Sequence, residues 1–330
     1  MPNGLLILYC DLGLIDWGIM MVMAARLSIG SFSKICFSSS LVLVRTPDKG
    51  NIMASQNQYQ LTESDLNNLK AWFFQYVQSF HSIDPIVQEA MVLKEKHSLR
   101  VCNEIRNIGK ELGLDDNNMR LAEAMALFHD IGRFEQYTRY QTFVDKKSEN
   151  HGELGVKVLQ QEKALAGLDE ETQDLILKTI SYHNRLSVPE DESAVCIYFS
   201  KLLRDADKLD IFNLVSTYYY VDHAERSAAI ELDLPDLPEV SAEILDSLQE
   251  GKMISMQQLR SLNDFKLLQM AWVYDINCQP TFQMIHERDY LKMIRDTLPA
   301  SERIDQIYSR LLSYLKRNSG FSDPKQLCPI

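Results

Sequence analysis

The segment Leu121-Ala-Glu-Ala-Met-Ala-Leu-Phe-His-Asp-Ile-Gly-Arg133 is the most informative part of the chain. Its apolar residues recur at helical spacing and lead directly into His129 and Asp130. An unpaired buried carboxylate costs on the order of several kcal/mol, so an aspartate that ends an apolar helix needs a partner. Gly132 permits a backbone turn there, which would let both side chains aim at one point. The segment predicts a helical core with a polar site built into it.

Helical periodicity extends along the chain from Leu61, with no alternating strand pattern and no Asn-Gly hairpin signal. Thr62 and Asp65 have the spacing of a helix-initiating capping box, and Gly113 and Gly132 stand where helices are expected to stop. The predicted fold class is therefore all-α. The expected helices cover about 62–80, 84–112, 117–129, 149–162, 170–184, 193–220, 240–250, 255–276, 280–297 and 301–317.

Four further segments place a metal-capable side chain on an apolar helical face. His97, for example, lies four residues from both Leu93 and Val101, so it points inward with them. The other three are His151, His183 and Asp207. A single histidine of this kind is usually a hydrogen-bonded core residue. Several buried imidazoles and carboxylates together, however, can offset their desolvation by coordinating a cation.

The remaining histidines do not follow this pattern. His81 lies in a connector, His223 in a charged segment, and His286 on a charged late helix. We expect surface or capping roles for all three.

The ordered set His97, His129-Asp130 and Asp207 resembles the HD phosphohydrolase superfamily. The string from His129 to Arg133 is similar to the HDIG signature, with arginine where lysine is common. The segment Asp205-Ala-Asp-Lys-Leu-Asp210 resembles the closing Ala-Asp-Lys segment; we place the ligand at Asp207 and keep Asp205 as the alternative. The resemblance covers about 90–220 and implies an HD-domain helical bundle, here with additional C-terminal helices.

Two further histidines resemble those of binuclear members of this superfamily. His151-Gly-Glu-Leu-Gly155 is similar to their H-x-x-x-G segment, and His183-Asn184 falls where they carry the next histidine. The resemblance implies two divalent transition metal ions, which could be Mn, Fe, Co or Ni. The first ion would be held by His97, His129, Asp130 and Asp207, and the second by His151 and His183, with Asp130 bridging the two.

The resemblance also implies an activity. A metal-activated water would cleave a phosphate ester, as a phosphomonoesterase or phosphodiesterase acting on a nucleotide or another small phosphorylated metabolite. Asp130 and Arg133 are the expected catalytic residues. Basic side chains are expected to hold the phosphate oxygens, because guanidinium groups suit bidentate phosphate contact. These substrate-binding candidates are Arg133, Arg139, Arg185 and Lys208. The polar segment 139–150 is an expected substrate lid.

The sequence lacks the motifs that are typical of two groups within the superfamily. No Gly-Tyr-Pro motif follows His183, unlike the standard HD-GYP cyclic-di-GMP phosphodiesterases, and no Glu-Asp pair follows Asp130, unlike the (p)ppGpp hydrolases. Two alternatives to a phosphohydrolase stay open. One is an HD-fold di-iron oxygenase, which resembles this ligand set. The other is a non-catalytic nucleotide-sensing HD module.

Composition limits the partners. The chain has 330 residues and a formal net charge of −12. This acidity argues against a nucleic-acid polymer but permits a small phosphorylated substrate, because a pocket can be locally basic or carry metal. The 6 cysteines are scattered, with no C-x-x-C pair, which is typical of a reduced, intracellular protein. We therefore expect a cytoplasmic location.

The chain divides into three expected parts. Residues 1–52 are interpreted as a poorly structured or apolar extension outside the native fold; a weak membrane anchor is the less favoured alternative, and no membrane association is expected. Residues 53–235 are the expected HD phosphohydrolase domain. Residues 236–330 are an expected helical region that packs on the core or forms a homodimer surface.

Overall fold

The computed structural model describes residues 58–185, 187–221, 228–231, 234–250, 254 and 258–320. This part of the chain folds into α-helices and short 3-10 helices without any strand, which confirms the all-α fold class. None of its helices is both long enough and apolar enough to cross a membrane. The predicted extension 1–52 and His223 lie outside the described residues.

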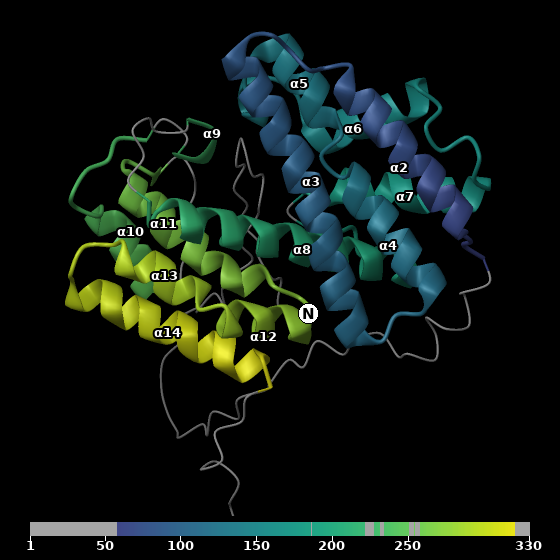
Figure 1. The fold of residues 1–330 in the computed structure, drawn as a ribbon. Coiled ribbons are helices and arrows are strands. Elements are labelled where there is room, and N and C mark those ends of the chain that lie inside the picture. Colours follow the sequence, from purple (N-terminus) through teal and green to yellow (C-terminus); the bar gives the residue numbers. More distant parts are fainter. Residues whose placement is uncertain are drawn as a thin grey trace, which may run out of the picture.

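The helices fall into an early group, one long connecting helix and a late group (Figure 1). The early group contains α2 (Glu63–Gln78), α3 (Pro85–Leu112), α4 (Asp116–Phe128), α5 (Gly132–Tyr140), α6 (His151–Gln161) and α7 (Glu170–Tyr182). The connecting helix is α8 (Ala194–Tyr218). The late group contains α9 (Ala228–Glu231), α10 (Ala242–Gln249), α11 (Leu262–Ala271), α12 (Gln279–Glu287), α13 (Tyr290–Asp296) and α14 (Glu302–Asn318).

Several helix ends follow directly from local sequence. Thr62 caps α2 through a reciprocal capping box with Asp65, as predicted. Asp84 accepts hydrogen bonds from the first backbone N–H groups of α3, and Pro85 fits its first turn. Gly113 ends α3 with φ 72°, a left-handed conformation that favours glycine.

Other expectations were wrong in detail. Gly132 begins α5, a helix that the sequence did not predict, instead of terminating a helix. The expected helix 255–276 is shorter, because α11 starts at Leu262 and a 3-10 turn, Trp272–Asp275, follows it. The expected helix 280–297 is split into α12 and α13 at Asp289, whose φ of 53° is incompatible with a continuous helix.

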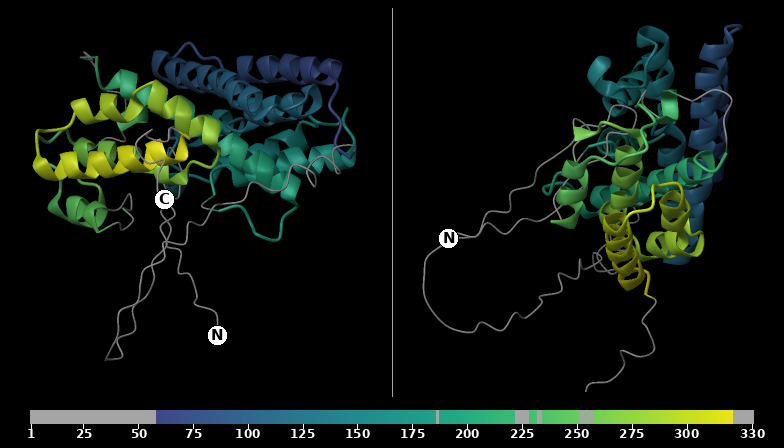
Figure 2. Two further views of the ribbon diagram at one scale, coloured as in Figure 1. Left: turned by 90° about the horizontal axis from the view of Figure 1, so that it is seen from below. Right: turned by 90° about the vertical axis from the view of Figure 1, so that its left-hand side faces the viewer.

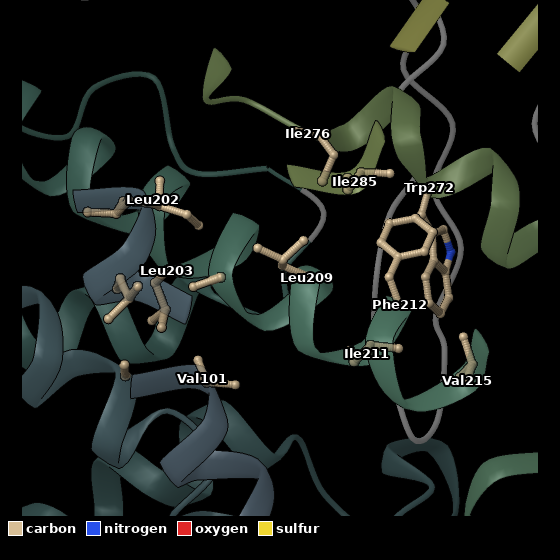
Figure 3. Close-up of a cluster of buried hydrophobic side chains, with 14 of the residues drawn as sticks. Val101, Leu202, Leu203, Leu209, Ile211, Phe212, Val215, Trp272, Ile276 and Ile285 are labelled. Carbon is tan, nitrogen blue, oxygen red and sulfur yellow. The ribbon is translucent and has the colours of Figure 1, made fainter. Parts of the chain in front are cut away.

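The connecting helix α8 holds the two groups together. It contacts α3, α4 and α7 on the early side and α12 and α13 on the late side. Figure 1 and the left view of Figure 2 show the early group at one end of the molecule and the late group at the other. Figure 3 shows Leu203 of α8 near Val101 of α3 and, further along α8, Phe212 facing Trp272. The part of α8 that carries Asp207 therefore lies within one continuous apolar core.

Candidate metal centre

Five helices bring the predicted metal ligands together in the interior. One histidine lies within α3, one begins α6, and two directly follow the last residues of α4 and α7. Each ligand side chain belongs to a residue that is at most 6 % exposed. The full set is His97, His129, Asp130, His151, His183 and Asp207.

His97, His129 and Asp207 form one cluster, which we call the first half-site. His97 Nε2 lies 3.1 Å from Asp207 Oδ1 and 3.2 Å from His129 Nε2. Asp130 Oδ2 faces the same point, 3.5 Å from His97 Nε2 and 3.8 Å from His129 Nε2. Nitrogen and carboxylate oxygen atoms at this spacing are suited to a divalent metal ion.

His151 and His183 form the second half-site. Their Nε2 atoms are 3.0 Å apart, and they lie 3.4 Å and 4.0 Å, respectively, from Asp130 Oδ1. The two oxygens of Asp130 therefore face different histidine pairs. Asp130 is placed as the carboxylate shared by both half-sites.

The sequence model of the HD domain family matches residues 95–211. These residues form an HD domain. The family belongs to a superfamily of metal-dependent hydrolases, and the buried His/Asp clusters of this chain are suited to divalent metal ions. Neither the curated proteins nor the solved structures that were searched include a match.

Each half-site of the HD domain contains one histidine held by a carboxylate, which we call the carboxylate-backed histidine. His97 Nδ1 lies 2.7 Å from Asp210 Oδ2, and His151 Nδ1 lies 2.7 Å from Asp145 Oδ2. A carboxylate anion only accepts hydrogen bonds, so Nδ1 carries the proton in both cases. This leaves Nε2 directed towards the centre, as in metal-binding histidines.

Each half-site also contains a carbonyl-backed histidine. His129 Nδ1 lies 2.8 Å from Ala126 O, and His183 Nδ1 lies 2.6 Å from Ile180 O. In each pair the carbonyl lies three residues earlier, in the last turn of the helix that the histidine follows. The helix end thus provides an otherwise unsatisfied acceptor that fixes the tautomer of the histidine.

The electrostatics of the centre favour a cation. Burial lowers the pKa of His129, His151 and His183, so these imidazoles are neutral. Burial also acts on His97, but hydrogen bonds with Asp207 and Asp210 outweigh it and raise its pKa to about 9. Two carboxylates that favour a proton on His97 would equally favour a metal ion beside it.

The second half-site provides a sharper test of whether the residues present suit a metal ion. His151 and His183 are both neutral and both donate through Nδ1, so their Nε2 lone pairs face each other at 3.0 Å. Two lone pairs at this distance repel unless a cation lies beside them. The residues present therefore fit a metal ion held between His151, His183 and Asp130.

Gly132 allows the two half-sites to approach each other. A Cβ atom at this position would lie 2.3 Å from the carbonyl oxygen of His151 and 2.6 Å from the backbone nitrogen of Gly155. Its φ is not positive, so glycine is required by close packing of α5 on α6, and not by a turn as predicted. This contact places the residue two positions after Asp130 directly against the start of α6, which carries His151.

Arg133 lies inside the wall of the site. Its residue is 1 % exposed, and its guanidinium lies 3.4 Å from Asp130 Oδ1 and 2.9 Å from Asp145 Oδ1. Arg133 thereby joins the shared carboxylate to the carboxylate behind His151. These contacts describe a positioning residue, and direct contact of Arg133 with a substrate stays a prediction.

Lys94 is a component that the sequence did not reveal. Its Nζ lies 2.9 Å from Asp130 Oδ2 and over the ring of Phe143, and its side chain is 12 % exposed. Burial lowers the pKa of Lys94, while Asp130 opposes this change. Lys94 lies three residues before His97, so helical spacing could have placed it on the same face.

The ambiguity between Asp205 and Asp207 is resolved by the directions of their side chains. Asp207 faces His97, whereas Asp205 accepts hydrogen bonds from the backbone N–H groups of Asn277 and Cys278.

Lys208, a predicted phosphate contact, lies fully buried with its Nζ 2.8 Å from Asp275 Oδ2. Lys208 is thus directed towards the late helices.

The other two predicted substrate contacts are nearer the surface. Arg139 is paired with Glu135 and lies 3.4 Å from Glu149. Arg185 is paired with Glu153 at 3.1 Å. The expected lid, 139–150, contains the end of α5 and the 3-10 turn Asp145–Lys147, whose Asp145 is buried behind His151. Part of that segment therefore supports the metal centre.

Proposed function

We propose that this HD domain is a phosphohydrolase that uses two divalent transition metal ions, of Mn, Fe, Co or Ni, to cleave a phosphate ester of a nucleotide or another small phosphorylated metabolite. The observation that carries the proposal is the placement of Asp130, whose two oxygens face two separate pairs of buried histidines. Binuclear centres with a shared carboxylate suit in-line displacement at phosphorus.

The chain offers a complete set of groups for this chemistry. A bound pair of ions would supply a water of lowered pKa and neutralise charge on the phosphoryl oxygens. The first ion would be held by His97, His129 and Asp207, the second by His151 and His183, and both by Asp130.

The protein's own charges support an anionic substrate. Lys94 places an ammonium group at the shared carboxylate, where it adds positive charge to the centre. Arg133 holds Asp130 and Asp145 in place, which keeps the shared carboxylate and His151 in register. The net charge of −12 favours a small substrate over a nucleic-acid polymer, and the free thiols of Cys102 and Cys196 fit the proposed cytoplasmic location.

Metal content and phosphate release test this proposal together. We expect the wild-type protein to bind two ions and to release phosphate from a panel of nucleotides and small phosphomonoesters with at least one of Mn, Co, Ni or Fe. His151→Ala should retain one ion and lose most activity. His81→Ala is the matched control, because His81 lies outside the centre, beside Glu95, and should retain both.

Other outcomes would overturn the proposal in distinct ways. Two bound irons with oxygen uptake and no phosphate release would favour the di-iron oxygenase. Nucleotide binding without turnover, whichever metal is supplied, would favour the sensor. A wild-type protein that binds only one ion would remove the second half-site from the mechanism.

A further inference from the structure

The turn of α8 that carries Asp207 also faces the late helices. Arg204 and Lys208 are buried there, and Asp275 Oδ2 lies 2.8 Å from Arg204 Nη2 and 2.8 Å from Lys208 Nζ. Asp275 belongs to the 3-10 turn Trp272–Asp275, which follows α11. Asp275 of the late group thus pairs with two cations next to the metal centre, and Asp205 on the same turn of α8 adds negative charge near Lys208.

Arg204 extends this link to the second half-site. Its Nη1 donates a hydrogen bond to the backbone carbonyl of His183 at 3.1 Å and another to the carbonyl of Arg185. These carbonyls follow the end of α7, where the helix no longer provides donors. A buried guanidinium at this point both satisfies the carbonyls and complements the negative end of the helix dipole.

We propose that Arg204 and Asp275 are positioning residues for the second metal ion, an inference that rests on the binuclear centre proposed above. Arg204 fixes the backbone of His183, and Asp275 fixes the guanidinium of Arg204. The direction of the His183 ring depends on this backbone, because its Nδ1 donates to Ile180 O in the same turn. A shift of the turn would move Nε2 away from His151 and Asp130.

Asp275 is needed for this arrangement because charge must be balanced. The side chains of Arg204 and Lys208 are 4 % and 0 % exposed, so neither cation can be solvated where it lies. Without the carboxylate, their mutual repulsion would displace the guanidinium from the His183 carbonyl. The late helices would thereby act on the half-site that contains His183, whose backbone carbonyl accepts the hydrogen bond from Arg204.

Titration of the full-length protein with Mn²⁺ alone tests the proposal. Asp275→Asn and Arg204→Gln should each keep the first ion and bind the second about 10- to 100-fold more weakly, the range found when outer contacts of metal ligands are lost. Arg204→Gln leaves Asp275 paired with Lys208, so it removes one buried charge and keeps a balanced pair. Arg204→Lys should recover part of the lost affinity.

The matched control is Asp205→Asn. Asp205 lies on the same turn of α8, is buried, and also ties α8 to the late helices, but it bonds Asn277 and Cys278 instead of the His183 segment. This variant should bind two ions with wild-type affinity. Equal weakening in Asp205→Asn would attribute the effect to general loosening of the late helices and overturn the proposal.

Other outcomes of the Mn²⁺ titration would also overturn the positioning role. Wild-type affinity for the second ion in both Asp275→Asn and Arg204→Gln would overturn the positioning role while leaving the binuclear centre intact. A wild-type protein that binds a single ion would instead refute the binuclear centre, and the inference with it. If Asp275→Asn does not fold, the comparison of Arg204→Gln with Arg204→Lys gives the answer.

Discussion

The two half-sites of the metal centre are assembled from the same parts on different supports. Each has one carboxylate-backed and one carbonyl-backed histidine, and an arginine stands behind each backing carboxylate: Arg100 behind Asp210 and Arg133 behind Asp145. In the first half-site the backing carboxylate lies on the long helix α8, three residues after a ligand. In the second it lies on a three-residue 3-10 turn.

The ligand count also differs. The first half-site contributes Asp207 as a carboxylate of its own, whereas the second depends on Asp130, which it shares. Fewer anionic ligands and a shorter supporting element imply weaker, more exchangeable metal binding at the second half-site. We therefore expect the proposed second ion to exchange more readily than the first, although the histidine contacts of the two half-sites are alike.

The largest expected effect comes from removing what the half-sites share. Asp130→Asn takes one negative charge from both, so both ions should bind weakly and hydrolysis should fall at least about a thousandfold. Metal content and phosphate release measure this, with Asp205→Asn as the buried-aspartate control. Retention of either ion at wild-type affinity would show that Asp130 is not shared.

Removing one histidine from each half-site tests their independence. His183→Ala should lose the second ion and keep the first, while His97→Ala should weaken the first ion, because each change removes one direct ligand. Competition with a chelator followed by metal analysis separates the two ions. If His183→Ala and His97→Ala lose the same ions in the same order, the centre behaves as one unit and the comparison fails.

Substituting the carboxylates behind His97 and His151 tests the independence of the half-sites with a smaller expected effect. Asp210→Asn and Asp145→Asn each keep the shape of the side chain but weaken the acceptor for Nδ1 of His97 or His151. We expect a loss of about 10- to 100-fold in affinity, confined to the half-site concerned. Calorimetric titration of each variant with Mn²⁺ checks this expectation. A loss at the opposite half-site would contradict it.

The smallest expected effect concerns the close packing at Gly132 that lets the half-sites approach each other. Gly132→Ala forces α5 away from the carbonyl of His151 and should lower the free energy of unfolding by about 1–3 kcal/mol, as overpacking does. Gly167→Ala is the matched control, since nothing lies within 4 Å of a Cβ there. Urea denaturation measures both. Equal stability of the two variants would mean that this contact imposes no constraint.

The predictable and unpredictable parts of the site differ in physical kind. Apolar spacing fixes which side of a helix is buried, so the inward direction of His97 and Asp207 could be anticipated, while their shared site was implied by the resemblance to the HD superfamily. Asp210 could have been added, because it lies three residues after Asp207 on a predicted helix. Asp145 had no such signal, because it lies in a polar connector whose path depends on tertiary contacts.

Contacts between the early and late helices could also not be predicted from local sequence patterns. Lys208 was predicted to bind phosphate as one of the basic residues near the site, yet it faces Asp275, a residue in a distant 3-10 turn. The extra helix α5 was missed because Gly132 has a low helix propensity, which close packing on α6 overrides. In both cases a long-range contact decides the outcome.

The scattering of the ligands from α3 to α8 gives bound metal a second effect. His97 and Asp207 are more than a hundred residues apart, so an ion between them is a reversible cross-link across most of the HD domain. Because such a link exists only in the folded chain, it would add stability by mass action, about 2.7 kcal/mol at a free ion concentration of 100 times Kd. The melting temperature of this protein would therefore rise with the free metal concentration around it.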